Sequence, residues 1–454
     1  MRGEMETREP QPPRRGGQMR CALAVMAVAI ALCLLIAGPA SAAPRSPLQP
    51  ISSQQLDPRL QELSFTTPAL TGPTGVRVLL PDGYSSSHRR YPVLYLLHGC
   101  CNGTVGYRSW TDQMGAEALT AGLPLIVVMP DGGSNGGYVN WWNFGAQGPP
   151  DWETYHVGEL IPWVDSHYRT IATRSGRALA GLSMGGDGAI HYAARHPDMF
   201  VSASAYSGAV DLNVVRPAEA AVGLDSDQPL GSYKTDQIRT RAVNSWDLAA
   251  NLRGLRLSLR TGNGKNAAGK LIDPVEAVVH AANVSLNNRL DALGIAHVWD
   301  DYGAGTHTAP YWSRDLSLDL PLIMRTFRHP PKPPKKVTFT AAEPSYESYG
   351  WRVGVRRTAM EFSTLLKAGR RGFSLVGSGR AVVLTPRLYA PRSAHSVRIH
   401  SETGTRNATL HADRRGRLRI RLPLGPANPL PQYTPGAESH FFRTAVSVND
   451  ARAH

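Results

Sequence analysis

Ser183 lies in a glycine-flanked pattern that can turn a hydroxyl group into a nucleophile. Residues 181–185 read Gly-Leu-Ser-Met-Gly, after an apolar run at 178–180 and before a helix-like stretch that starts near Asp187. A serine at such a strand-to-helix turn projects its hydroxyl group, and a Cβ on either flank would clash, which explains the glycines. The context of strand, serine and helix therefore predicts nucleophilic catalysis at Ser183 rather than an ordinary turn.

His307 is the histidine that we expect to take the proton from Ser183. A serine hydroxyl is inert near neutral pH unless a base removes its proton. With this serine motif the histidine comes last in the sequence, after the final strand. His307 follows the apolar run around Val298 in a glycine-rich loop. The chain has 15 histidines, so order and strand context select this one, whereas His297 falls inside the preceding strand and is expected to be structural.

A carboxylate must orient the imidazole and stabilise its positive form. It should lie between Ser183 and His307, after the strand that ends near Arg260. The candidates are Asp273, Glu276, Asp300 and Asp301. The last two are too close to His307 in the same loop, and the pattern alone leaves Asp273 and Glu276 as equal candidates.

Two backbone amides should bind the oxyanion of the tetrahedral intermediate. One is that of Met184, directly after the nucleophile, and the other comes from the loop after an earlier strand. That strand ends at His98-Gly99, so we expect the second donor to be Cys100, acting through its amide and not its thiol. This chemistry requires no metal or cofactor, and we predict none.

Short apolar runs alternate with helical patterns over the first three quarters of the chain. Such runs are typical of strands buried on both faces of a parallel sheet covered by helices. The runs are at 93–97, 125–129, 177–180, 255–260 and 297–299, and helices are expected at 152–168 and 274–293. Together with the serine motif, they predict a doubly wound α/β-hydrolase domain over residues 76–328, preceded by a Pro/Ser/Gln-rich lead-in along the surface at 43–75.

The N-terminal residues 1–42 read as an export signal. Arg14, Arg15 and Arg20 precede an apolar stretch, and Ala-Ser-Ala at 40–42 gives a cleavage site after Pro39. We therefore expect a secreted or cell-envelope protein, with an uncleaved membrane anchor as the alternative. Two of the four cysteines leave with this signal, and for the adjacent pair Cys100-Cys101 we expect two free thiols, because adjacent cysteines can bridge only through a strained ring.

A second, basic domain follows a proline-rich linker at 329–336. Short alternating runs between turn residues predict a small all-β, sandwich-like domain over residues 337–454. From Lys335 to His454 there are 20 Lys and Arg residues against 7 Asp and Glu, which accounts for nearly all of the net charge of +14. A solvated, arginine-rich surface is the simpler interpretation, and contact with the cell wall or an anionic polymer is the functional one. No nucleic-acid-binding pattern is present, so we expect no nucleic-acid partner.

Several ordered motifs between about Val76 and Phe327 resemble the esterase D family, and within it the antigen 85 mycolyltransferases. The motifs are 95–99 (YLLHG), 128–133 (VMPDGG), 181–186 (GLSMGG), 262–264 (GNG) and 305–307 (GTH). In the mycolyltransferases the acid is a glutamate on the helix after Gly-Asn-Gly, which implies Glu276 rather than Asp273. The family's oxyanion amides fall on Cys100 and Met184. At the position of His98-Gly99-Cys100-Cys101, the mycolyltransferases have a segment like Asp-Gly-Leu-Arg. The His-Gly pair of this chain is similar to the segment found in the hydrolytic members of the family.

We therefore expect a secreted serine hydrolase that cleaves a carboxylic ester of a sugar, a lipid or a small alcohol through an acyl-enzyme. The closest alternative is an acyltransferase, in which a sugar or lipid alcohol replaces water. An alternative of another class is a non-catalytic protein that binds the cell wall or a polysaccharide.

Overall fold

The computed structural model describes residues 47–101 and 103–450. The predicted export signal lies outside the described residues. Within these ranges every helix is too short or too polar to cross a membrane.

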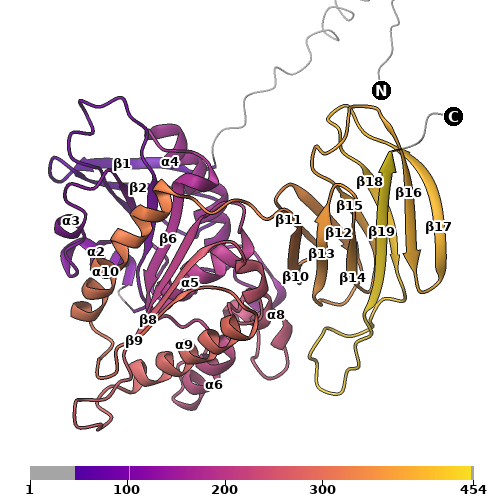
Figure 1. Ribbon diagram of the computed structural model, residues 1–454. Helices are drawn as coiled ribbons and strands as arrows, with labels where there is room; N and C mark the ends of the chain where they lie inside the picture. Colours follow the sequence, from indigo (N-terminus) through magenta and orange to yellow (C-terminus); the bar gives the residue numbers. More distant parts are fainter. Residues whose placement is uncertain (1–46, 102, 451–454) are drawn as a thin grey trace, which may run out of the picture. The chain divides into compact units, whose positions relative to one another are not determined.

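A nine-stranded sheet forms the framework of the first domain (Figure 1). Six neighbouring strands, β4 to β9, run parallel to one another, and β1, β2 and β3 are added antiparallel at one edge. Across the sheet the order is β1 (Gln49–Gln55), β2 (Leu60–Thr66), β3 (Thr74–Leu79), β5 (Ile126–Pro130), β4 (Val93–Leu97), β6 (Arg177–Leu182), β7 (Ser202–Tyr206), β8 (Arg256–Thr261) and β9 (Val298–Asp301).

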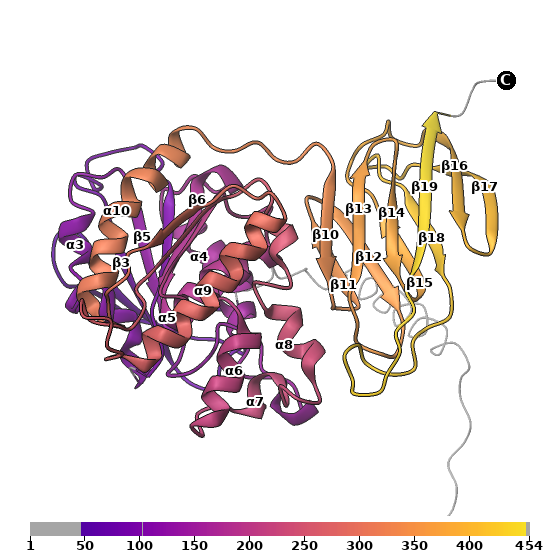
Figure 2. The same ribbon diagram turned by 60° about the horizontal axis from the view of Figure 1, so that its bottom comes forward.

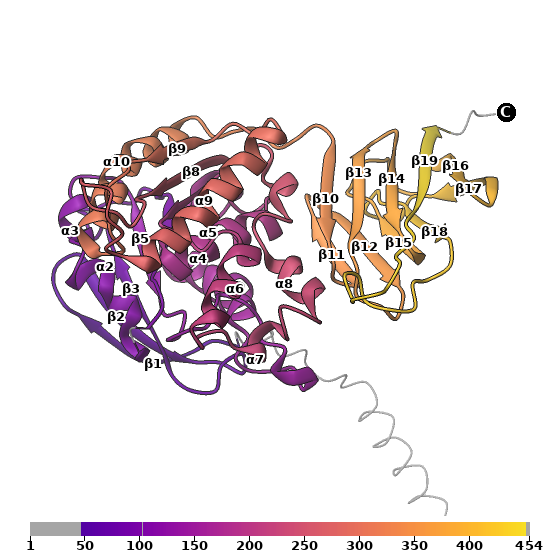
Figure 3. The same cartoon turned by 90° about the horizontal axis from the view of Figure 1, so that it is seen from below.

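Side chains of the central strands alternate between two cores, one on each face of the sheet. On β4, Val93, Tyr95 and Leu97 belong to one core, while Leu94 and Leu96 belong to the other. Helices cover both faces: α4 (Ile161–His167), α5 (Ser183–Arg195) and α9 (Pro274–Ala292) pack on the first core, and α3 (Ala116–Leu119) and α10 (Ala309–Arg328) pack on the second (Figure 3). The remaining α-helices of the described residues are α2 (Ser109–Asp112), α6 (Leu212–Ala221), α7 (Asp227–Leu230) and α8 (Gln237–Val243). The predicted α/β-hydrolase fold is confirmed.

The segment at 43–75 differs from the surface lead-in that the sequence predicts. Its β1 is exposed at every residue, but β2 buries Leu60, Leu63 and Phe65. Because strands pair through their backbones, a polar composition did not prevent this segment from extending the sheet. The β7 strand was also missed, since its sequence Ser-Ala-Ser-Ala-Tyr lacks the large apolar residues of a typical buried strand.

The second domain is an antiparallel sandwich, as the sequence predicts. Its six-stranded sheet (Figure 2) has the order β10 (Val337–Ala341), β13 (Ser363–Gly369), β14 (Gly372–Gly377), β19 (Phe442–Asp450), β16 (Ala394–Ser401) and β17 (Gly404–His411). Its four-stranded sheet has the order β11 (Ser345–Ser348), β12 (Trp351–Arg356), β15 (Gly379–Leu384) and β18 (Arg419–Leu424). Hydrogen bonds join this domain to the first one: Asn251 and Thr340 exchange two of 2.9 Å, and the Tyr349 amide donates to Asp198 Oδ2 at 2.8 Å.

Candidate active site

Ser183 begins α5 directly after β6, on a sharp turn. Its φ of +52° is rare for a residue with a side chain, and it projects the hydroxyl group from the carboxyl edge of the sheet. The flanking glycines have no room for a Cβ: one at Gly181 would lie 2.2 Å from the Gly185 oxygen, and one at Gly185 would lie 2.4 Å from the His98 oxygen. The predicted reason for the glycines therefore holds in atomic detail.

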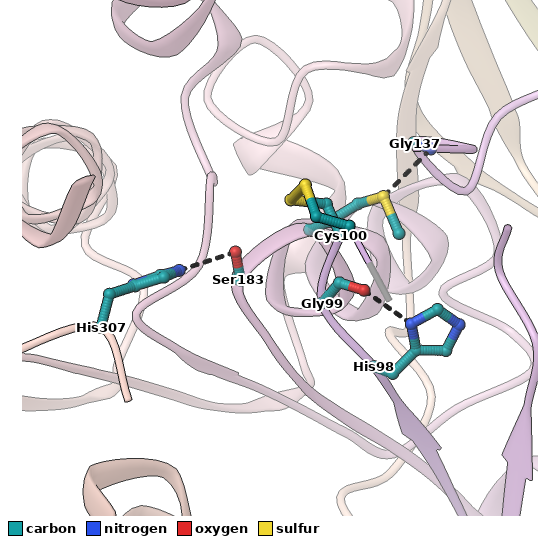
Figure 4. The surroundings of a disulfide bond; sticks show 8 residues. His98, Gly99, Cys100, Gly137, Ser183 and His307 are labelled. Carbon is teal, nitrogen blue, oxygen red and sulfur yellow. Dashed lines mark hydrogen bonds between the residues drawn. A yellow bond between two sulfur atoms is a disulfide. The ribbon is translucent and has the colours of Figure 1, made fainter. Parts of the chain in front are cut away.

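His307 lies between Ser183 and Glu276 and hydrogen-bonds to both. Its Nε2 is 2.8 Å from Ser183 Oγ, and its Nδ1 is 2.7 Å from Glu276 Oε2. Figure 4 shows the imidazole pointing at the serine hydroxyl from the loop after β9. This ring packs against Trp312 at nearly a right angle, with the two centroids 5.0 Å apart. A carboxylate on Nδ1 places the proton there and leaves Nε2 free to accept the serine proton.

The Glu276 carboxylate is fully buried and is held by several donors. Its Oε1 accepts hydrogen bonds from the Gly262 amide at 2.7 Å, from Ser207 Oγ at 2.8 Å and from Thr261 Oγ1 at 3.3 Å. Hydrogen bonds to the charged form compensate for the loss of water around a buried carboxylate. The remaining oxygen, Oε2, is thereby kept in line with His307.

The other three acidic candidates lie elsewhere. Asp273 caps α9 by accepting from the Glu276 amide at 3.1 Å, and its second oxygen accepts from the His307 backbone amide at 2.8 Å. Burial raises the pKa of Asp273, but backbone hydrogen bonds, from His307 and Glu276 above all, together with the charge of His307, leave the pKa below its usual value. Asp300 pairs with Arg260, and Asp301 pairs with His280. Asp273 thus holds the histidine loop without touching the imidazole.

Both predicted oxyanion donors adjoin Ser183. Met184 is the second residue of α5, where amides have no acceptor within the helix. In the described part of the chain the Cys100 amide meets no hydrogen-bond acceptor, and its neighbour Gly99 is so close that an added Cβ would lie 3.2 Å from Ser183 Cβ. Both amides are therefore available to donate to an oxyanion formed next to Ser183.

The Esterase family model matches residues 67–323, more than half of the 454 residues. The chain belongs to the Esterase family. It is 40% identical over 258 residues to Esterase Rv1288 of Mycobacterium tuberculosis, covering 55% of this chain and 56% of that protein. The chain thus spans little more than half the length of this curated relative.

More distant relatives are acyltransferases. The chain is 29% identical over 266 residues to diacylglycerol acyltransferase/mycolyltransferase Ag85A of M. tuberculosis, covering 53% of this chain and 75% of that protein. The solved structure of M. tuberculosis MPT51 matches 61% of this chain and 100% of its own at 22% identity, with a TM-score of 0.48. The predicted resemblance to esterases and antigen 85 proteins is confirmed by the family model and by these sequence relatives.

In this member of the Esterase family, Cys100 and Cys101 form a disulfide, so the prediction of two free thiols was wrong. The backbone conformation explains the difference. Cys101 adopts a left-handed φ of +72°, and its amide donates to the Ser134 oxygen at 2.6 Å. The resulting bend brings the two side chains together. The sequence showed only that the residues were adjacent, and adjacency does not determine φ.

No side-chain role was predicted for His98, but its ring contacts the loop that carries the Cys100 amide. Its ring is buried, with Nδ1 2.6 Å from the Gly99 oxygen and Nε2 accepting from the Gly132 amide at 2.7 Å. Tyr138 also donates to the His98 backbone oxygen at 3.0 Å. The His-Gly pair at a strand end and the Asp-Gly-Gly at 131–133 were the available signals, although only the fold brings them together.

Proposed function

We propose that this esterase is a secreted serine carboxylic-ester hydrolase that acts through Ser183, His307 and Glu276. One observation carries the proposal: a single imidazole bridges the nucleophile at 2.8 Å and a buried carboxylate at 2.7 Å. The order of the three residues in the sequence, with the serine first and the histidine last, supports the same mechanism.

The reaction follows from this arrangement. His307 Nε2 takes the proton as Ser183 Oγ attacks the ester carbonyl, and Glu276 stabilises the imidazolium. The Cys100 and Met184 amides bind the oxyanion, each lowering the barrier by about 3 kcal/mol. His307 then returns the proton to the departing alcohol, and water, activated by the same imidazole, hydrolyses the acyl-enzyme. The substrate is an acyl ester of a sugar, a lipid or a small alcohol.

Turnover of p-nitrophenyl butyrate tests this mechanism. We expect hydrolysis by the wild type, loss of at least about 10³-fold in kcat in Ser183→Ala, and covalent labelling of Ser183 by a fluorophosphonate. A fluorophosphonate adduct on another residue, or full activity in Ser183→Ala, would rule the mechanism out.

Transfer of the acyl group to an alcohol is the alternative outcome of the same acyl-enzyme. The 40% identity to a protein named as an esterase favours water as the acceptor over the transfer activity of the relatives at 29%. Product analysis in the presence of added sugars and glycerol separates the two reactions. A transesterified product that exceeds the free acid would favour the transferase.

Secretion is part of the proposal and rests on the pattern at residues 1–42 and on the disulfide. Disulfides persist in oxidising compartments and are rare in the cytosol. We expect the mature protein in the culture medium or cell envelope with Ala43 as its first residue. N-terminal sequencing of the exported protein checks this, and a full-length cytosolic protein would contradict it.

A second candidate function concerns the outer face of the four-stranded sheet, which we propose binds an acidic polysaccharide of the cell envelope. Exposed arginines follow neighbouring strands on this face: Arg352, Arg356, Arg380, Arg419 and Arg421. Within the described residues only Arg352 has a carboxylate partner, Glu347 at 2.6 Å. Arg356 and Arg380 are directly opposite each other, where like charges destabilise a sheet by up to about 1 kcal/mol. A bound polyanion would remove this repulsion.

Retention on immobilised heparin, used as a polyanion probe, tests this surface. Arg380→Glu/Arg421→Glu should elute at lower salt than the wild type. Arg398→Glu/Arg443→Glu is the matched control, because it makes the same charge change on the exposed face of the six-stranded sheet. Equal shifts in both variants would show a dependence on net charge alone. Stronger binding to vesicles of anionic lipid than to acidic polysaccharide would point to a membrane partner instead.

A further inference from the structure

We propose that the Cys100–Cys101 disulfide holds the oxyanion-hole amide in position, so that reduction of this bond lowers the rate of ester hydrolysis. The inference rests on the proposed function, because it takes Ser183 as the nucleophile. It concerns a positioning group: neither sulfur takes part in the acyl transfer.

The disulfide lies at the nucleophile. β4 ends at Leu97, and the next residues pass directly over the serine turn, where a Cβ added at Gly99 would lie 2.5 Å from Leu182 Cδ1 and 3.2 Å from Ser183 Cβ. Figure 4 shows the disulfide above Ser183, on the side away from His307. Any movement of this loop therefore changes the surroundings of the reacting carbonyl.

One side of the oxyanion peptide is fixed by His98. The Gly132 amide can only donate, so His98 Nε2 accepts its hydrogen bond, and Nδ1 carries the proton that is donated to the Gly99 oxygen at 2.6 Å. The peptide between Gly99 and Cys100 is trans, so its carbonyl oxygen and its N–H point in opposite directions. Holding the oxygen against His98 therefore directs the Cys100 N–H away from His98, toward the serine.

The disulfide fixes the other side of this peptide. It closes a small ring that contains the Cys100–Cys101 peptide bond, and it keeps Cys101 at a φ of +72°. Residues with a side chain avoid this left-handed region unless the surroundings enforce it. With the bond broken, Cys101 is free to return to a negative φ, and the Cys100 amide turns with it. The remaining hydrogen bond, from the Cys101 amide to the Ser134 oxygen, involves a loop residue rather than the sheet.

The bond is accessible to reductants. Cys101 is exposed and Cys100 is partly exposed, and exposed disulfides are the ones that thiols reduce most readily. A dithiol reduces the bond in two exchanges: its first thiolate attacks one sulfur and expels the other as a thiolate, and its second thiolate then displaces the mixed disulfide. The protein gains two electrons and two protons, and the dithiol becomes a cyclic disulfide.

Steady-state kinetics of the full chain in two redox states tests the proposal. The protein is purified without reductant, one half is treated with dithiothreitol, and the reductant is removed before the assay so that it cannot cleave the ester itself. Peptide mass after alkylation reports the state of Cys100 and Cys101. We expect kcat for p-nitrophenyl butyrate to fall by about tenfold to a hundredfold on reduction, because full loss of one oxyanion donor costs 10²- to 10³-fold. KM should stay within about twofold, since the oxyanion forms only in the transition state, and reoxidation should restore kcat.

Cys100→Ser/Cys101→Ser is the matched control, because it keeps both amides, lacks the disulfide and retains the other two cysteines. It should have the kcat of the reduced wild type and should not respond to dithiothreitol. Near-ultraviolet circular dichroism and Tm measure folding in parallel. An unchanged kcat in the fully reduced wild type overturns the inference, as does a loss that matches the unfolded fraction or appears only in KM. If the oxidised wild type lacks Ser183-dependent turnover, the proposed function itself fails.

Discussion

Replacing Glu276 with glutamine tests which carboxylate serves His307. The substitution keeps the size of the side chain but makes one of its two terminal atoms a donor. The Gly262 amide, 2.7 Å from Oε1, can only donate, so the glutamine must present its oxygen to Gly262 and its NH₂ group to His307. The imidazole then has to accept at Nδ1, which moves its proton to Nε2, the nitrogen that faces Ser183. In this tautomer the histidine cannot take the serine proton.

The expected loss of kcat is large because the glutamine side chain cannot avoid the wrong tautomer by turning its amide group around. Turning the amide around would place its NH₂ group against the Gly262 N–H, in a site that is fully buried. A wrong tautomer in a serine triad lowers kcat by about 10⁴-fold, which corresponds to about 5 kcal/mol of activation free energy. The assay is kcat for p-nitrophenyl butyrate at pH 7.5 or so, with Tm measured alongside.

Asp273→Asn is the control, because Asp273 is three residues away and accepts only from backbone amides. The variant loses one of these hydrogen bonds, which costs about 1–3 kcal/mol of stability. Its Tm should fall and its kcat should change by about tenfold at most. The reasoning is refuted if Asp273→Asn loses more kcat than Glu276→Gln, or if Glu276→Gln stays within about tenfold of the wild type.

Three further predictions concern stability and the oxyanion loop. Burial raises the pKa of Asp315 from 3.8 to about 7, so between these pH values the folded state keeps a proton that the unfolded chain has released. The free energy of unfolding therefore falls as the pH rises through this window. In urea titrations Asp315→Asn should abolish this slope and should be more stable than the wild type at pH 8, by at most about 4 kcal/mol. Gly99→Ala should lower kcat by at least about tenfold, because its Cβ would lie 3.2 Å from Ser183 Cβ; unchanged kinetics would show that the loop has more room. Asn251→Ala leaves the backbone amide and carbonyl of Thr340 unpaired at the contact between the domains. The variant should lower the free energy of unfolding by about 1–3 kcal/mol and keep kcat within about twofold of the wild type. A large loss of kcat would mean that the second domain shapes the active site.

The sequence by itself determined the residues whose positions follow from local geometry or from chain order. The turn at Ser183 requires small neighbours, so the glycines at 181 and 185 disclosed it. The parallel strands bring their carboxyl ends to one edge of the sheet, and the loop after the last strand can therefore reach Ser183, which selected His307. Both arguments need only the order of the elements and the space within one turn.

Only the tertiary structure decided which of several nearby groups makes each contact. Asp273 and Glu276 lie within one turn of the same helix start, so no pattern separates them, and the direction in which α9 meets the His307 loop assigns the imidazole to Glu276. The link between His98 and Gly132 joins the ends of β4 and β5, which become neighbours only in the folded sheet. The Cys100–Cys101 bond goes with a left-handed φ at Cys101, which adjacency in the sequence does not determine. Hydrogen-bond partners are chosen by distance and direction in space, and neither is encoded in residue type or spacing.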